Sequence, residues 1–327
     1  MTSRRVLALI MLAALAGCGQ RSEQDLLASA QKRLAQKDAA GATIELKNLL
    51  QQSPDNAQAR YLLGKALLDA GDMAGAEIEL RRARELGAPR DELAPLLAEA
   101  LLNSGQARKV IGEFNDQSLA DPAAMATLQR WLALAYLSQG NLTEAKVSAG
   151  RALQLQPESE EAVLVSARVK LAGNSADEAL AQLDDLLQKN PKSARGLQLK
   201  AEVLLSRGQV DEAKPLLDGV LAIEPNSYDA RALLLRIALG QQNLDAATRL
   251  VDEMPPALAK KPQGRFLQAQ LALAKNEAAK ARDLALPLIK QMPNYLPLLR
   301  LASGAHQQLG ELADVRSNTL KELRQDE

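Results

Sequence analysis

Residues that could carry out catalysis or bind a metal are few in this sequence, and they lie far apart. His306 is the only histidine and Cys18 the only cysteine among 327 residues. A zinc site needs several histidine, cysteine or acidic ligands together, so the sequence predicts no metal site and no cofactor. A single cysteine also excludes an intramolecular disulfide. We interpret His306 as a structural residue of a helix.

Ser29 and Lys32 have the spacing of a serine–lysine nucleophile pair. The companion motifs of such enzymes are missing, and both residues are expected on an exposed first helix. Paired acids such as Asp184 and Asp185 lie among other charges, which is typical of a solvated helix face. The chain is therefore predicted not to be an enzyme, and a hydrolase remains the least favoured alternative.

The chemistry expected of Cys18 is covalent attachment of lipid. Two arginines precede an apolar run from Val6 to Ala16, which is typical of a signal peptide and shorter than the roughly 20 residues that span a bilayer. The run ends in Leu15-Ala16-Gly17-Cys18, which resembles the lipobox of bacterial lipoproteins. The resemblance implies a signal peptide over residues 1–17, a lipidated Cys18 and a short tether over residues 18–22.

Gly19 follows Cys18, whereas lipoproteins kept at the inner membrane of enteric bacteria have aspartate there. The resemblance thus implies a lipid anchor in the cell envelope at the periplasmic face of the outer membrane. The inner membrane is the alternative location. Lysine plus arginine number 40, as do aspartate plus glutamate. With no net charge there is no general attraction to nucleic acid.

A small residue recurs along the chain at an almost constant interval, and a single interval is longer by one position. The column is Ala42, Ala76, Val110, Ala145, Ala179, Ala213, Ala247, Ala281 and Val315. Its period of about 34 residues resembles that of the tetratricopeptide repeat, a helix-turn-helix unit. The resemblance implies an all-α fold, a right-handed superhelical solenoid of about nine units over residues 23–327.

Glycine and proline mark the boundaries in the same phase. Glycine tolerates the left-handed conformation that ends a first helix, as expected at Gly71 and Gly173, and proline separates one unit from the next. The predicted units are 23–54, 57–89, 92–122, 126–157, 160–191, 194–225, 228–256, 262–293 and 296–327. The helical pattern lapses at 115–122 and 255–262.

Two prolines fall within predicted helices. Pro215 is expected near a helix start, where the missing N–H would have no partner in any case. Pro287 is expected to kink or shorten the helix over 279–291. The last segment, 312–324, has sparse apolar residues on a polar background and suits the end cap of an open stack.

In tetratricopeptide arrays the first helices line a concave groove. The resemblance places eleven residues there: Tyr61, Lys65, Arg130, Leu134, Arg168, Gln198, Glu202, Arg236, Phe266, Gln270 and Arg300. Lys65, Arg168 and Arg236 share one repeat position, so a slightly basic groove is expected, suited to an acidic peptide, an anionic polymer or a carboxylate. Ordinary surface arginines are the simpler alternative. The aromatic and arginine members are the expected anchors.

Several segments have a closer resemblance. Residues 44–57, 59–66, 76–89, 95–102 and 109–114 resemble the N-terminal part of the PrsT family, the tetratricopeptide-repeat lipoproteins of the PEP-CTERM/exosortase system. This implies a non-catalytic protein–protein interaction scaffold serving exopolysaccharide production or surface-protein sorting. Its partners would be envelope proteins or peptides, and the N-terminal lipid would attach the protein to the membrane. The alternative is an accessory lipoprotein for outer-membrane protein or pilus assembly.

Overall fold

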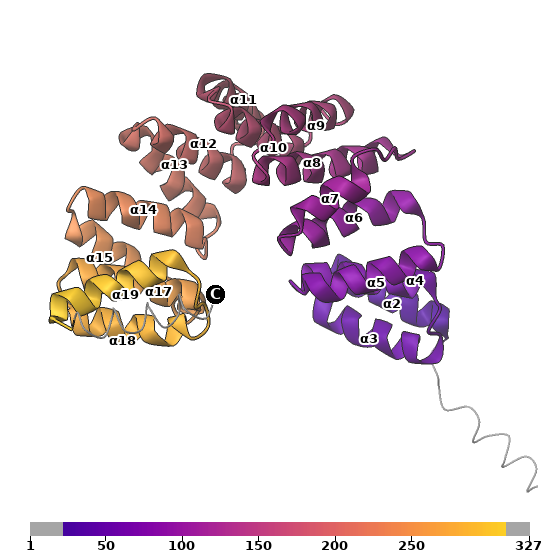
Figure 1. The fold of residues 1–327 in the computed structure, drawn as a ribbon, viewed down its shortest axis with the longest axis horizontal. Helices are drawn as coiled ribbons and strands as arrows, with labels where there is room; N and C mark the ends of the chain where they lie inside the picture. The colour runs from indigo at the N-terminus through magenta and orange to yellow at the C-terminus, as the bar shows by residue number, and fades with distance from the viewer. Residues whose placement is uncertain (1–21, 312–327) are drawn as a thin grey trace, which may run out of the picture. The chain divides into compact units, whose positions relative to one another are not determined.

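The computed structural model describes residues 22–311 of the chain. Within that range the chain forms eighteen helices, α2 to α19, and no strand (Figure 1). Two compact bodies share these helices, one ending at Gly173 and the other beginning at Asn174. The predicted signal peptide, Cys18, the short tether before Ser22, Val315 and the predicted end cap lie outside the described residues.

The first body contains four pairs of helices and the first helix of a fifth pair. In chain order these are α2 (Glu23–Ala35), α3 (Ala39–Gln52), α4 (Ala57–Asp69), α5 (Met73–Glu85), α6 (Arg90–Asn103), α7 (Ala107–Phe114), α8 (Pro122–Ser138), α9 (Leu142–Leu155) and α10 (Glu160–Ala172). Each of these helices packs against the next along the chain.

The second body continues the same alternation. Its helices are α11 (Ala176–Lys189), α12 (Ala194–Ser206), α13 (Val210–Ile223), α14 (Tyr228–Gly240), α15 (Leu244–Asp252), α16 (Pro256–Ala259), α17 (Pro262–Ala274), α18 (Ala278–Ile289) and α19 (Leu296–Leu309). The helix pairs follow the predicted units, and α19 is the first helix of the ninth.

The recurring small residue lies in the core of each of the first eight units. All eight members from Ala42 to Ala281 are 0% exposed. Side chains this small let neighbouring helices approach closely enough to exclude water. The predicted role of this column is confirmed for all of its described members.

The turn inside each unit contains one residue with a positive φ. Nine such residues repeat with the period of the chain: Lys37, Gly71, Gly105, Gly140, Asn174, Gly208, Gln242, Asn276 and Gly310. The prediction for Gly173 was wrong, because Gly173 has φ −87° and Asn174 takes the left-handed conformation at φ 60°. Asparagine tolerates this region better than most side chains.

The prolines inside helices have different effects. Pro215 is the sixth residue of α13, so it lies beyond the first turn and removes a bond that the helix would otherwise make. The helix is continuous, as predicted, but the expected reason was wrong. Helix α18 ends two residues after Pro287, which agrees with the predicted shortening.

Two second helices are much shorter than the others. Helix α7 has 8 residues and α15 has 9, whereas α3, α9, α11 and α13 have 14 each. The segments after α7 and α15 are the two predicted lapses, and the second contains the short α16. Within residues 22–311, no helix is both long and apolar enough to cross a bilayer.

Candidate functional site

The predicted binding residues of the first body lie on a row of first helices. Tyr61 and Lys65 are on α4, Arg130 and Leu134 on α8, and Arg168 on α10. Helix α6 packs beside both α4 and α8, and α8 packs beside α10. We call the surface formed by Tyr61, Lys65, Glu92, Glu99, Arg130 and Arg168 the first-helix face of this body.

Tyr61 is half-buried on this face beside a residue that the prediction did not include. Burial raises the pKa of Tyr61, and the charge of Glu92 and a hydrogen bond with Glu92 raise it further. Glu92 is on α6, so this contact joins the first helices of two successive units. Tyr61 therefore presents an amphipathic ring at the border between two repeats.

Glu99 on α6 is the second residue that the prediction did not include. Burial raises the pKa of its carboxyl, the charge of Arg130 opposes that shift, and the charge of Asp69 adds to it. The three groups come from α4, α6 and α8. Arg130 also lies over the ring of Trp131, with its guanidinium carbon 5.6 Å from the ring centroid, a cation–π contact.

Side chains of both charge signs occupy one repeat position along the chain. Glu99 lies one repeat after Lys65 and Glu202 lies one repeat after Arg168, both in the column that contains Arg236. Lys65, Arg168 and Arg236 are exposed, whereas Glu99 and Glu202 are half-buried. The description of a slightly basic groove is therefore incomplete, because acidic side chains share the same repeat position.

In the second body, the predicted residues lie on first helices, and their exposure varies. Gln198 donates from its side-chain nitrogen to Glu202 Oε1 at 3.0 Å, within α12. Arg236 on α14 and Arg300 on α19 are exposed, and Gln270 on α17 is half-buried. These positions agree with the predicted location on first helices.

Phe266 is the exception, because the structure places it in the core at 4% exposure. Its ring meets Tyr295 edge-on, with centroids 5.6 Å apart and planes at 69°. Tyr295 also neighbours Tyr228. Burial of Tyr228 and the adjacent Tyr295 raise the pKa of Tyr228 to about 12. The expectation that Phe266 is a binding anchor was wrong, and Tyr295, at 39% exposure, is the accessible ring of this cluster.

The chemical candidates lie apart from one another. His306 Nδ1 is 2.9 Å from Glu311 Oε2, and Arg282 Nη1 is 3.0 Å from Glu311 Oε1, so the only histidine belongs to an ion-pair cluster at the end of α19. Ser29 is half-buried on α2 and Lys32 is exposed. Among residues 22–311, no three histidine, cysteine or acidic side chains converge as metal ligands.

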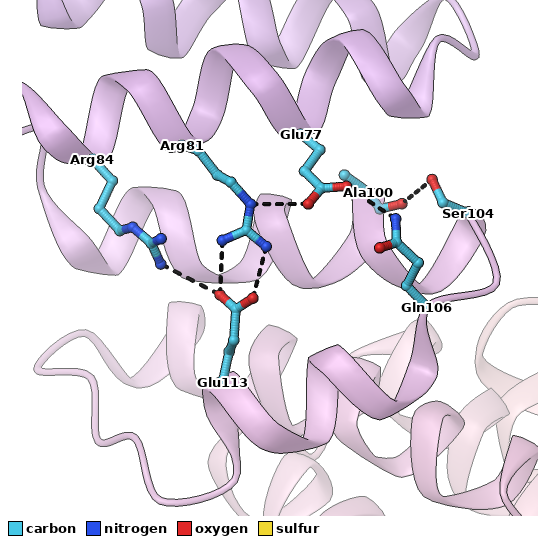
Figure 2. A network of polar contacts seen from close by, with 7 residues as sticks. All are labelled: Glu77, Arg81, Arg84, Ala100, Ser104, Gln106 and Glu113. Carbon is cyan, nitrogen blue, oxygen red and sulfur yellow. Dashed lines mark hydrogen bonds and ion pairs between the residues drawn. The ribbon is translucent and has the colours of Figure 1, made fainter.

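A polar network joins the second helices α5 and α7 (Figure 2). Arg81 donates a hydrogen bond to Glu77 on its own helix at 2.9 Å. It also donates to both carboxylate oxygens of Glu113 on α7, at 2.7 and 3.1 Å. Gln106, just before α7, donates to Glu77 at 3.0 Å. Hydrogen bonds from Arg81 hold the pKa of Glu113 below its ordinary value. This network fixes two adjacent units to each other.

Comparison with known families agrees with this geometry. A model of the family described as "Tetratricopeptide repeat" matches residues 33–96, 136–203 and 204–271, which together make up more than half of the chain. The chain belongs to the tetratricopeptide-repeat family. The predicted superhelical solenoid class is the architecture of that family, and its repeats serve as protein-interaction scaffolds.

Solved structures with a similar fold cover most of this tetratricopeptide-repeat chain. A human IFIT1 dimer with m7Gppp-AAAA aligns at a TM-score of 0.62 and 15% identity, over 97% of this chain and 75% of that one. A tetratricopeptide repeat protein from Parabacteroides merdae aligns at 0.52 and 15%, over 88% and 99%. PilW, a type IV pilus biogenesis factor, aligns at 0.55 and 18%, over 66% and 100%.

These identities show a shared fold alone. No curated protein sequence matches this chain significantly.

Proposed function

We propose that this tetratricopeptide-repeat protein is a non-catalytic scaffold that binds a segment of a partner protein on the first-helix face of its first body. The observation that carries the proposal is the row of polar and aromatic side chains contributed by successive first helices α4, α6, α8 and α10. A row of this kind suits an extended segment better than a compact small molecule, because each unit adds one more set of contacts.

The chemistry of the face favours a partner that carries both charge signs and an apolar anchor. Tyr61 and Arg130 are the residue types that dominate binding energy in protein interfaces. Lys65 and Arg168 offer exposed cations, whereas Glu99 offers a carboxylate whose raised pKa records the cost of its burial. A partner cation beside Glu99 would offset part of that cost.

We further propose that the protein is anchored in the cell envelope by lipid on Cys18, facing the periplasm from the outer membrane. The support is the sequence pattern of residues 1–18. Growth with a labelled palmitate should mark the native chain and leave a Cys18→Ser variant unmarked. Equal labelling of the two chains would contradict the lipid anchor. It would not bear on the proposed binding surface, which is tested separately.

For the cellular role we favour exopolysaccharide production and export or PEP-CTERM surface-protein sorting, supported by the resemblance of residues 44–114 to that lipoprotein family. The alternative is assistance to outer-membrane protein or pilus assembly, a role with which the fold shared with PilW is compatible. A deletion strain distinguishes them. Loss of secreted polysaccharide or sorted surface protein with normal pili supports the first, and the reverse supports the second.

The binding surface is tested by site-specific photo-cross-linking in intact cells. A photoreactive residue replaces Lys65 on α4, and a matched variant carries it at Arg151, which is exposed on the second helix α9. The proposal expects a discrete cross-linked partner from position 65 and little product from position 151. Equal products from both positions, or none from position 65, would contradict it.

A further inference from the structure

Three second helices of the first body expose an aliphatic side chain at the same repeat position. Ile44 on α3 is 62% exposed, Ile78 on α5 is 66% exposed and Val147 on α9 is 45% exposed. The same position in α7 is Gly112, so no polar side chain interrupts the column. Single exposed aliphatic residues are common on protein surfaces, whereas these recur with the period of the array. The first body therefore carries an apolar column on its second helices.

The acids beside this column are turned inward and paired. Glu45, Glu79 and Glu113 occupy the next repeat position along α3, α5 and α7, and their side chains are only 10%, 18% and 28% exposed. Each carboxylate accepts a hydrogen bond from an arginine, at 2.7 to 2.9 Å. The exposed acids of these second helices are Glu85, which is itself ion-paired, and Glu144. Little uncompensated negative charge therefore remains on this surface.

Cations on the same second helices remain exposed. Lys47 on α3, Lys109 on α7 and Lys146 on α9 are all exposed, and none of the three forms an ion pair with any residue in the range 22–311. We call the surface formed by Ile44, Ile78, Val147, Lys47, Lys109 and Lys146 the second-helix face of the first body. It combines aliphatic side chains with positive charge that no ion pair neutralises.

The second helices of the second body differ in both features. Their residues at the position of the aliphatic column are Ala181, Pro215, Arg249 and Asp283. Helices α11 and α13 expose a series of acids instead: Asp177, Asp184, Asp185, Asp211, Glu212 and Asp218. The apolar and basic character thus belongs to the body that follows the proposed site of lipid attachment.

The chain enters the first body beside the end of α3. Ser53, which follows α3, donates a hydrogen bond to Glu23, the first residue of α2, and Asn56 donates to Glu23 Oε2 at 3.2 Å. Four residues separate Glu23 from Cys18, and five peptide units span at most about 18 Å. Ile44 lies about 12 Å along the helix from the end of α3. A lipid on Cys18 would therefore hold this part of the body close to a bilayer.

We propose that the second-helix face of the first body lies on a bilayer surface that contains anionic phospholipid. The aliphatic side chains enter the boundary between headgroups and acyl chains, and the lysines face the lipid phosphates. This inference rests on the lipid anchor proposed above, which supplies most of the affinity, while the face sets the orientation of the body. One aliphatic side chain per helix suits a fluid bilayer better than a protein partner, whose interface relies on packed, desolvated pockets. The first-helix face stays available to a partner.

The test couples the purified mature chain through Cys18, its only thiol, to a maleimide lipid in vesicles of phosphatidylethanolamine and phosphatidylglycerol. This coupling supplies the anchor whether or not the cell attaches lipid there, so the face is tested independently of the proposed lipidation. A photoreactive residue replaces Ile78, and a matched variant carries it at Lys65 on α4 of the same body. We expect at least about fivefold more cross-linked phospholipid from position 78. Equal yields from the two positions, or no lipid product from position 78, would overturn the proposal.

A second series tests the contribution of charge in the same assay. Reversal of Lys47 and Lys146 to glutamate should lower the lipid product from position 78 at least about fivefold, as should vesicles of neutral phosphatidylcholine alone. Reversal of Lys214 and Lys290, which are exposed in the second body, should leave it unchanged. Circular dichroism checks that both variants keep native helicity. Insensitivity to both changes would overturn the proposal. So would a cross-link from position 78 in intact cells to a second copy of the chain or to one discrete protein in place of lipid.

Discussion

Arg81 on α5 holds Glu113 on α7 with two nitrogens of its guanidinium, at 2.7 and 3.1 Å. The two side chains are 27% and 28% exposed, so water screens this pair less than a fully exposed one. The same arginine also bonds Glu77 at 2.9 Å. One side chain thus ties the second unit of the array to the third, next to the shortest of the paired second helices.

Replacing this arginine should destabilise the first body. Arg81→Met keeps much of the apolar stem but removes the bidentate pair, and we expect a loss of about 1–2 kcal/mol in the free energy of unfolding. Urea denaturation followed by circular dichroism measures it. Arg82→Met is the control, because Arg82 is 48% exposed with exposed partners, and it should cost less than about 0.5 kcal/mol.

The ion pair between Arg81 and Glu113 should make the free energy of unfolding depend on pH. Hydrogen bonds from Arg81 lower the pKa of Glu113 in the folded chain, so its contribution is fully present above the unfolded value of about 4.3. It is lost as the pH falls through the folded value. The difference in unfolding free energy between the native chain and Arg81→Met should therefore shrink below about pH 4. A constant difference down to pH 3 would show that the pair contributes nothing through charge.

Glu99 should behave in the opposite way. Burial raises the pKa of its carboxyl despite the nearby Arg130, so the folded chain bears a cost for the ionised form at neutral pH, and that cost disappears on protonation. Glu99→Gln should raise stability at pH 7 by less than about 1 kcal/mol, since partial exposure screens the charge. Chemical denaturation at pH 7 measures the gain in stability. The same measurement at pH 4 should give a smaller difference between the two chains, because the native carboxyl then gains a proton. A variant less stable than native at pH 7 would contradict this reading.

Enlarging a member of the buried column should disrupt the packing of helix pairs. Ala76 on α5 is 0% exposed, and Ala76→Leu should cost about 1–3 kcal/mol because the added carbons have no space. Ala74 is exposed on the same helix, so Ala74→Leu should change stability little. Thermal unfolding of the two variants side by side makes the comparison. Equal melting temperatures would contradict the close approach inferred from this column.

The repeat pattern predicts the fold well because each unit repeats the same local requirements. The column from Ala42 to Ala281 needs small side chains for helix contact, and this need is readable at a fixed period. The same register could have revealed Glu99, which lies one repeat after Lys65. The prediction of a slightly basic groove rests on Lys65, Arg168 and Arg236 and omits Glu99, which has the opposite charge at the same repeat position.

Other features depend on contacts between helices and could not be read from one position. Phe266 is buried in a cluster with Leu288 and Leu298, and Tyr295 at the start of α19 meets its ring edge-on. Arg60 and Arg231 share a repeat position, and each donates to a proline carbonyl six residues earlier, Pro54 at 2.9 Å and Pro225 at 3.2 Å. Arg60 also reaches Glu79, at 2.7 Å, whereas Arg231 reaches the carbonyl of Leu250 at 2.6 Å. Arg231 is consequently only 5% exposed.

The central claim is that the first helices bind a partner protein through their charged positions. The most direct measurement is capture of envelope proteins by the native chain, by a double variant with Lys65 and Arg168 each replaced by glutamate, and by a control with Lys37 and Arg151 replaced likewise. All four residues are exposed and lie in the first body. We predict that the native chain and the control capture the same discrete partner, and that the first variant loses most of it while keeping its helicity. Unchanged capture by that folded variant would contradict the account.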